Sequence, residues 1–114
     1  MNRELRIIIA GESGLSVRCL GDLSDVIGAC FGADGLILDE TDLGGEFFDL
    51  RSGLAGELIQ KFVNYRLRVA IVVAAPEVYG GRFGELAYEH ATHDIVRFVH
   101  SKEEATGWLR RRQG

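Results

Sequence analysis

Ser52 is the residue of this chain whose type and surroundings most directly suggest chemistry. It follows an expected strand at residues 36–39 and a polar turn, and it stands near the start of an expected helix, in the run Arg51-Ser52-Gly53-Leu54. A helix start presents unpaired backbone N–H groups and a partial positive charge, so a phosphate on this serine would be tolerated there. The same hydroxyl could instead only cap the helix. The sequence therefore predicts either a phosphorylation site or a local structural role.

The residues around Ser52 predict a binding surface. We expect Ser52 in the first turn of the helix, at least partly exposed, beside the ends of Asp39 and Arg51. For the adjacent Phe47 and Phe48 there are two alternatives. Either one is buried and the other is exposed next to Ser52, as is typical of interfaces, or both pack against the first helix and its loops. The candidate surface comprises Asp39, Phe47, Phe48, Asp49, Arg51 and Gly53, with Lys61, Asn64 and Tyr65 at the polar end of the helix. For those last three residues, a solvated helix face with a C-cap at Asn64 is the alternative.

The other residues that could do chemistry form no convincing site. His90 and His93 are three positions apart on an expected helix, but a metal site needs three or four ligands, so we predict no metal there. The turn Gly11-Glu12-Ser13-Gly14 lacks the Lys-Ser/Thr ending of a phosphate-binding loop. No serine or cysteine stands in a defensible catalytic triad order. We therefore expect no cofactor and favour a function other than catalysis.

Composition excludes several classes of partner. The 114 residues carry 13 Lys and Arg against 17 Asp and Glu, a formal net charge of −4, which disfavours a nucleic-acid-binding face. The basic run Arg110-Arg111-Arg112 is expected only to close a helix. The longest apolar run, residues 69–75, is far too short to span a membrane, and no leader segment is visible. The two cysteines, Cys19 and Cys30, are expected to be buried and reduced. We expect a cytoplasmic protein.

Hydrophobic periodicity predicts an α/β fold with the element order ββαβαβαβα in one domain, residues 1–114. Strands are expected at residues 5–10, 16–20, 36–39, 69–75 and 95–99. Helices are expected after an N-cap at Asp22, from within residues 47–57 to residue 64 or 65, at residues 83–90, and after a capping box at Ser101 and Glu104. The first two strands are expected to form a hairpin, and the alternation that follows favours parallel pairing, so the sheet should be mixed but mostly parallel. The run at residues 69–75 has no polar alternation and should be the central, least exposed strand.

Two family resemblances extend this interpretation. The order of elements resembles the STAS fold of sulfate transporters and anti-sigma-factor antagonists, and Leu38-Asp39-Glu40 and Arg51-Ser52-Gly53-Leu54 resemble their local motif. In the antagonists, a partner kinase of the histidine-kinase-like ATPase class phosphorylates the serine to which Ser52 corresponds. Here Leu50-Arg51 replaces the Asp-Ser of the motif, and Ala55 replaces its second glycine.

The second resemblance covers nearly the whole chain. The segment from Phe47 to Glu57, continued by Gln60 to Arg66, is similar to the signature of a bacterial family catalogued as domain of unknown function 4180. Gly32-Ala33-Asp34 and Tyr88-Glu89 also fit that signature. This family has no established activity, so the resemblance supports the fold.

Taken together, these features favour a non-enzymatic regulatory or protein-interaction module, STAS-like in fold, that is switched by phosphorylation at the start of its second helix. A homodimer is compatible with this hypothesis. One rival is a sensor that binds a small anionic ligand at the same helix N-terminus, because open α/β sheets bind ligands beyond the carboxyl ends of their strands. The other rival is an enzyme, for which we would expect a deep pocket.

Overall fold

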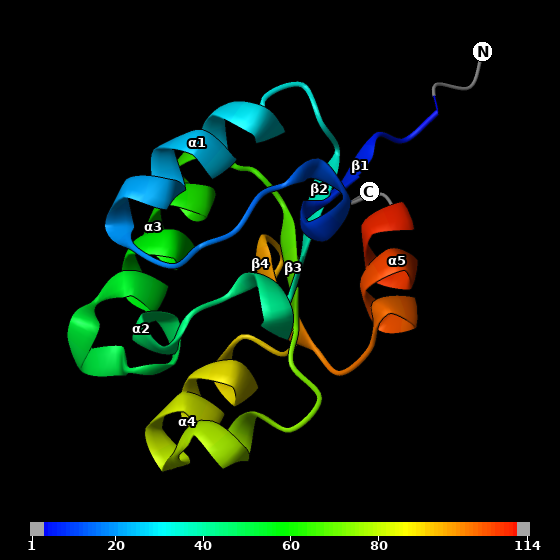
Figure 1. Cartoon of the computed structure of the whole chain (residues 1–114). Helices are drawn as coiled ribbons and strands as arrows, with labels where there is room; N and C mark the ends of the chain where they lie inside the picture. Colours follow the sequence, from blue (N-terminus) through cyan, green and yellow to red (C-terminus); the bar gives the residue numbers. More distant parts are fainter. Residues whose placement is uncertain (1–3, 112–114) are drawn as a thin grey trace.

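The computed structural model describes residues 4–111, which build a four-stranded parallel sheet with helices on both faces (Figure 1). The strands lie in the order β1-β2-β3-β4. They are β1 (Ile7–Ile9), β2 (Gly35–Asp39), β3 (Val69–Val72) and β4 (Val96–Val99). Each strand pairs in parallel with its sequence neighbour, with helices in the connections, so the α/β class and the alternation of strands and helices are confirmed.

The apolar run after residue 68 is a central strand, as its lack of polar alternation predicted. All four residues of β3 are buried, and the strand is flanked by β2 and β4. It is shorter than expected because the chain leaves the sheet after Val73: Ala74 and Ala75 are exposed, and a 3-10 turn, η4 (Pro76–Tyr79), begins directly afterwards. Neighbouring residues of β3 face opposite sides, with Ile71 in one apolar cluster and Ala70 in the other.

The larger apolar cluster lies under four helices on one face of the sheet. These are α1 (Leu20–Cys30), the short α2 (Gly45–Phe48), α3 (Leu54–Tyr65) and α4 (Gly81–Glu89). Their buried side chains recur at helical spacing, as at Leu54, Leu58 and Phe62 of α3. Helix α1 begins three residues earlier than predicted, because its N-cap is Cys19 and not Asp22. Asp22 lies within the first turn, where its carboxylate accepts from the Arg18 backbone N–H at 2.8 Å.

The opposite face is covered by one helix, α5 (Lys102–Arg110), which lies on its own side of the sheet in Figure 1. Its inward residues Ala105, Trp108 and Leu109 are buried, as predicted. The Ser101 cap is present, with Oγ accepting from the Glu104 N–H at 3.2 Å. The Glu104 carboxylate reaches the His100 N–H instead of that of Ser101, so the reciprocal half of the predicted capping box is displaced by one residue. Arg112 of the basic run lies outside the described residues.

Arg68 fastens the end of α5 to the sheet. Its Nη1 and Nη2 donate to the carbonyls of Leu109 and Trp108 at 3.2 and 3.0 Å, and its guanidinium lies 4.5 Å from the centre of the Trp108 ring. Arg97 approaches the same ring at 4.6 Å. Burial lowers the pKa of Arg68, and the charge of Arg97 acts in the same direction.

The predicted N-terminal hairpin is wrong. Residues after β1 form a 3-10 turn, η1 (Ala10–Ser13), and β1 pairs with β2 in parallel, so no antiparallel pair opens the sheet in the described chain. The alternation at residues 16–20 arises differently: Val17 is fully buried and makes an isolated parallel bridge to Leu43, while its neighbours face solvent or the rim. Cys19 is consequently exposed, against prediction, whereas Cys30 is buried; both thiols are free. Within residues 4–111 no helix is long and apolar enough to cross a membrane.

Candidate binding site

The segment that joins β2 to α3 is broken into three short turns of helix, where the sequence predicted the start of one long helix. Between Asp39 and Leu54 run η2 (Glu40–Asp42), α2 and η3 (Leu50–Ser52). Gly53 separates η3 from α3 because its φ of 82° lies in the left-handed region, where helical hydrogen bonding cannot continue. Ser52 is therefore exposed at the end of η3, two residues before α3, and not in the first turn of α3.

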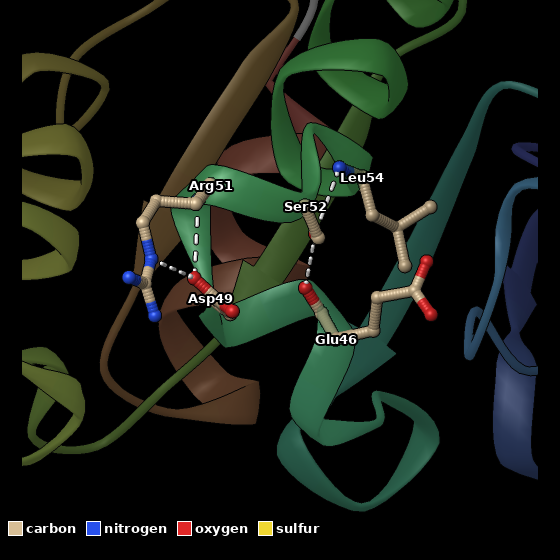
Figure 2. Close-up of polar contacts among 5 residues, drawn as sticks. All are labelled: Glu46, Asp49, Arg51, Ser52 and Leu54. Carbon is tan, nitrogen blue, oxygen red and sulfur yellow. Dashed lines mark hydrogen bonds and ion pairs between the residues drawn. The ribbon is translucent and has the colours of Figure 1, made fainter.

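The Ser52 hydroxyl joins two of these helical pieces (Figure 2). Its Oγ donates to the backbone carbonyl of Glu46 at 2.6 Å and accepts from the backbone N–H of Leu54 at 3.2 Å. One hydroxyl thus satisfies a carbonyl of α2 and the first amide of α3. Beside it, the Asp49 carboxylate accepts from the Arg51 backbone N–H at 3.1 Å and from Arg51 Nε at 3.4 Å. The Arg51 side chain nevertheless remains 89% exposed, so its guanidinium is accessible to a ligand although it also pairs with Asp49.

Phe47 and Phe48 enter the same aromatic cluster, whose other rings lie in η4 and α4. Neither of the two alternatives considered for them holds as stated, because Phe48 is neither fully exposed nor fully buried. Phe47 is fully buried and Phe48 is half-buried. The Phe48 ring stacks on Tyr79 with a centroid distance of 3.7 Å and an interplanar angle of 9°, and Phe83 meets both phenylalanines edge-on. This cluster holds α2 against η4 and the start of α4.

Glu40 sets the position of Tyr79. The Tyr79 hydroxyl donates to Glu40 Oε2, and the other carboxylate oxygen of Glu40 accepts from the Ala74 N–H at 3.1 Å. The hydrogen bond to Glu40 raises the pKa of Tyr79, with smaller contributions from burial and from the negative charge. Glu40 follows β2 and Ala74 follows β3, so this pair joins the carboxyl ends of two neighbouring parallel strands.

These elements surround an open surface hollow of about 720 Å³. It is lined by Gly45, Phe48, Asp49, Leu50, Arg51, Tyr79, Gly80, Gly81, Arg82 and Phe83. Three of the predicted surface residues, Phe48, Asp49 and Arg51, therefore meet at one place. Tyr79 and Arg82 were missed by the sequence reasoning. The signal that could have found them is that residues after adjacent parallel strands meet at the same edge of a sheet.

The other predicted surface residues do not line this hollow. Asp39 caps η2, accepting from the Thr41 N–H at 3.1 Å and from its hydroxyl at 2.9 Å, and it borders a different hollow together with Lys102. Phe47 is buried beneath the surface, and Gly53 forms the left-handed turn between η3 and α3. Asp39 was expected beside Ser52, but among residues 4–111 the two make no hydrogen bond to each other and have different partners.

Lys61, Asn64 and Tyr65 are exposed near the far end of α3. Tyr65 meets the exposed Phe31 ring edge-on at 5.6 Å. The helix is ended by Arg66, whose φ of 54° is left-handed, and not by Asn64. These residues form a second surface, separate from the hollow.

His90 and His93 both use Nδ1 for contacts with the backbone. His90 Nδ1 lies 3.0 Å from the Leu86 carbonyl oxygen, and His93 Nδ1 accepts from the N–H groups of Ile95 and Val96 at 3.0 and 3.2 Å. Their ring centres are 5.2 Å apart. Among residues 4–111 there is no group of three His, Cys, Asp or Glu that could hold a metal ion. These contacts account for the two histidines as local structural residues, and the absence of metal binding stays a prediction.

Comparison with known families decides the membership of the chain. Residues 2–109 match the model of a family described as a domain of unknown function, DUF4180. The chain belongs to this DUF4180 family. The predicted family is thereby confirmed. No curated protein and no solved structure matches the DUF4180 chain, so the STAS-like fold stays a prediction.

Proposed function

We propose that this chain is a non-enzymatic regulatory module that acts in the cytoplasm and binds a protein partner at the hollow between α2–η3 and η4–α4. The observation that carries the proposal is the convergence of Phe48, Asp49 and Arg51 with Tyr79 and Arg82 around one open hollow. Its floor is aromatic and its rim holds two arginines against one aspartate, Asp49. Aromatic residues and arginines are the side chains that most often anchor protein partners.

The charges of the rim indicate the character of the partner. Arg51 and Arg82 are both exposed, although the chain as a whole carries a net charge of −4. A partner segment with an apolar anchor and flanking acidic residues would fill the floor and pair with the rim. An open hollow suits such a segment better than it suits a small substrate, which enzymes usually enclose.

Ser52 supplies a mechanism for switching this surface. A partner kinase would transfer the terminal phosphoryl group of ATP to Ser52 Oγ, with loss of the hydroxyl proton and release of ADP. The phosphorylated oxygen could no longer donate to the Glu46 carbonyl, and up to two negative charges would face that oxygen and Asp49. Because α2 and η3 carry Phe48 and Arg51, releasing this hydrogen bond would change the side of the hollow that they form.

Affinity capture from native cell lysate with matched charge variants tests the proposal. Arg51→Glu and Arg82→Glu should each lose the proteins that the native chain retains. Lys61→Glu, the same change on the second surface, should retain them. Loss with Lys61→Glu alone would place the binding surface at the end of α3 and overturn the proposed site. For the switch, Ser52→Asp should weaken capture and Ser52→Thr should not, and mass spectrometry of the native protein should find phosphate on Ser52.

The rival ligand sensor is less well supported by the geometry. The first amide of α3, that of Leu54, is already bonded to Ser52, so the helix N-terminus on which this alternative depended is partly occupied. The two rim arginines would still suit an anionic metabolite. A rise in melting temperature with such a metabolite that is lost in Arg82→Glu, together with no protein captured, would favour the sensor.

A further inference from the structure

The two faces of the sheet are covered unequally. On one face, helices α1, α3 and α4 pack over the larger apolar cluster. On the other, α5 packs against β2, β3 and β4, and β1 lies beyond it. Ile7 and Ile9 of β1 contribute to the smaller cluster but are only partly buried. Parallel sheets are ordinarily covered on both faces, so the β1 side of this face lacks a covering element among residues 4–111.

A hollow of about 750 Å³ occupies this uncovered region. Its floor is made by the apolar side chains Leu5, Ile7, Ile9 and Ile37, and the remaining lining residues are Glu4, Thr106 and Arg110. Three of the four floor residues, Ile7, Ile9 and Ile37, belong to β-strands, and the rim carries one carboxylate and one guanidinium. Within the described chain, neither Glu4 nor Arg110 has an ion-pair partner.

Among the described residues, no strand pairs with the outer edge of β1. Leu36 gives its N–H to the Arg68 carbonyl on the β3 side, and Leu36 is the register partner of Ile8. The parallel ladder therefore joins Ile8 to the residues on either side of Leu36, and Ile8 directs its backbone groups toward β2. Because backbone groups alternate along a strand, the N–H and C=O of Ile7 point away from β2, toward the open edge. An apolar edge strand with free backbone groups is a ready site for pairing.

We propose that this surface, the β1 hollow, is a homodimer interface in which a second copy of the chain covers the first. The argument for a second copy is charge complementarity. A two-fold interface places the same patch against itself. Any contact between two different residues across it therefore occurs twice, once in each direction. A patch whose rim has one acid and one base is complementary to itself, with Glu4 of each copy facing Arg110 of the other. A partner of a single charge sign would leave one of the two unpaired.

Sedimentation of the intact chain, combined with charge reversal, tests the proposal. The native mass should rise with concentration from 12.6 kDa toward twice that value between about 1 µM and 1 mM, the range of moderate protein affinities. Glu4→Arg and Arg110→Glu should each weaken association about tenfold, because each replaces two symmetric attractions with repulsions. The double variant should restore association to within about threefold of native, since the pair is then exchanged.

Glu103→Arg is the matched control, because Glu103 is an exposed acid at the start of α5 that does not line the hollow. It should leave association unchanged. The three positions changed, Glu4, Glu103 and Arg110, are all exposed, so circular dichroism should report native folding for every variant. A native chain that stays monomeric over the whole range overturns the proposal, as does a dimer that ignores both single reversals or a double variant that is no better than either. A monomer whose β1 hollow instead binds lipid vesicles or another protein overturns it too.

Discussion

Replacing Ser52 should destabilise the fold by an amount that depends on which of its two hydrogen bonds the new side chain can still make. Ser52→Ala loses both the bond to the Glu46 carbonyl and the bond from the Leu54 N–H. Each such bond contributes about 0.5–1.5 kcal/mol net, and the exposed position favours the lower half of that range. We therefore expect Ser52→Ala to cost about 1–2 kcal/mol. Ser52→Thr keeps both groups and should remain within about 0.5 kcal/mol of native.

Ser52→Asp separates the two bonds. A carboxylate can still accept from the Leu54 N–H, next to the positive end of α3, but it cannot donate to the Glu46 carbonyl. The loss should therefore lie between those of Thr and Ala, at about 0.5–1 kcal/mol, and the domain should stay folded. This outcome is also what makes Ser52→Asp usable in the capture experiment.

Equilibrium unfolding in urea measures this series, with stabilities compared through midpoints at constant slope. Ser24→Ala is the control, because Ser24 is exposed on α1 and its side chain makes no hydrogen bond among residues 4–111. That change should be neutral or slightly stabilising, since alanine is the better helix former. If Ser52→Ala matched Ser24→Ala, or if Thr were as destabilising as Ala, the hydroxyl would not be fastening α2 to α3 and the switch would lose its mechanism.

Three further predictions concern other parts of the chain. Arg68→Ala should lower the free energy of unfolding by about 2–4 kcal/mol, because it removes two charge-assisted hydrogen bonds and the contact with the Trp108 ring, and Arg68→Lys should lower it by about half as much. The fluorescence of Trp108, the single tryptophan, should shift as its packing loosens, and an unchanged spectrum with native stability would contradict this role. Burial raises the pKa of the Cys30 thiol from 9.0 to about 11, so between these pH values the thiol is ionised in the unfolded chain and neutral in the folded chain. The free energy of unfolding should therefore fall by about 2–3 kcal/mol as pH rises through this window. A Cys30→Ala variant should lack this part of the slope, and an equal slope in both proteins would refute the assignment. Titration calorimetry with zinc and nickel should find no site tighter than tens of micromolar at His90 and His93, since His93 Nδ1 is already occupied by backbone amides; stoichiometric binding that vanishes in His90→Ala would show otherwise.

The candidate site was only half visible in the sequence. Phe48, Asp49 and Arg51 were expected at a surface, and they line the hollow. Tyr79 and Arg82, some thirty residues away, could be added only once β2 and β3 were known to be neighbours in parallel register. Asp39 was expected beside Ser52 because it ends the strand before it, but three separate helical turns intervene and its carboxylate serves the nearest of them.

The sequence by itself determined the elements whose physics is local or strongly periodic. The unbroken apolar run at β3 required burial on both faces, the spacing of Leu54, Leu58 and Phe62 required a helix with one buried side, and Ser101 is a cap wherever its helix packs. Only the tertiary structure decided what alternation meant at residues 16–20. A period of two says that one side of an extended segment is buried, but not which strand it pairs with. Here Val17 reached the core through a single bridge to Leu43, and β2 became the partner of β1, because a pairing partner is chosen by contacts distant in sequence, which no local pattern records.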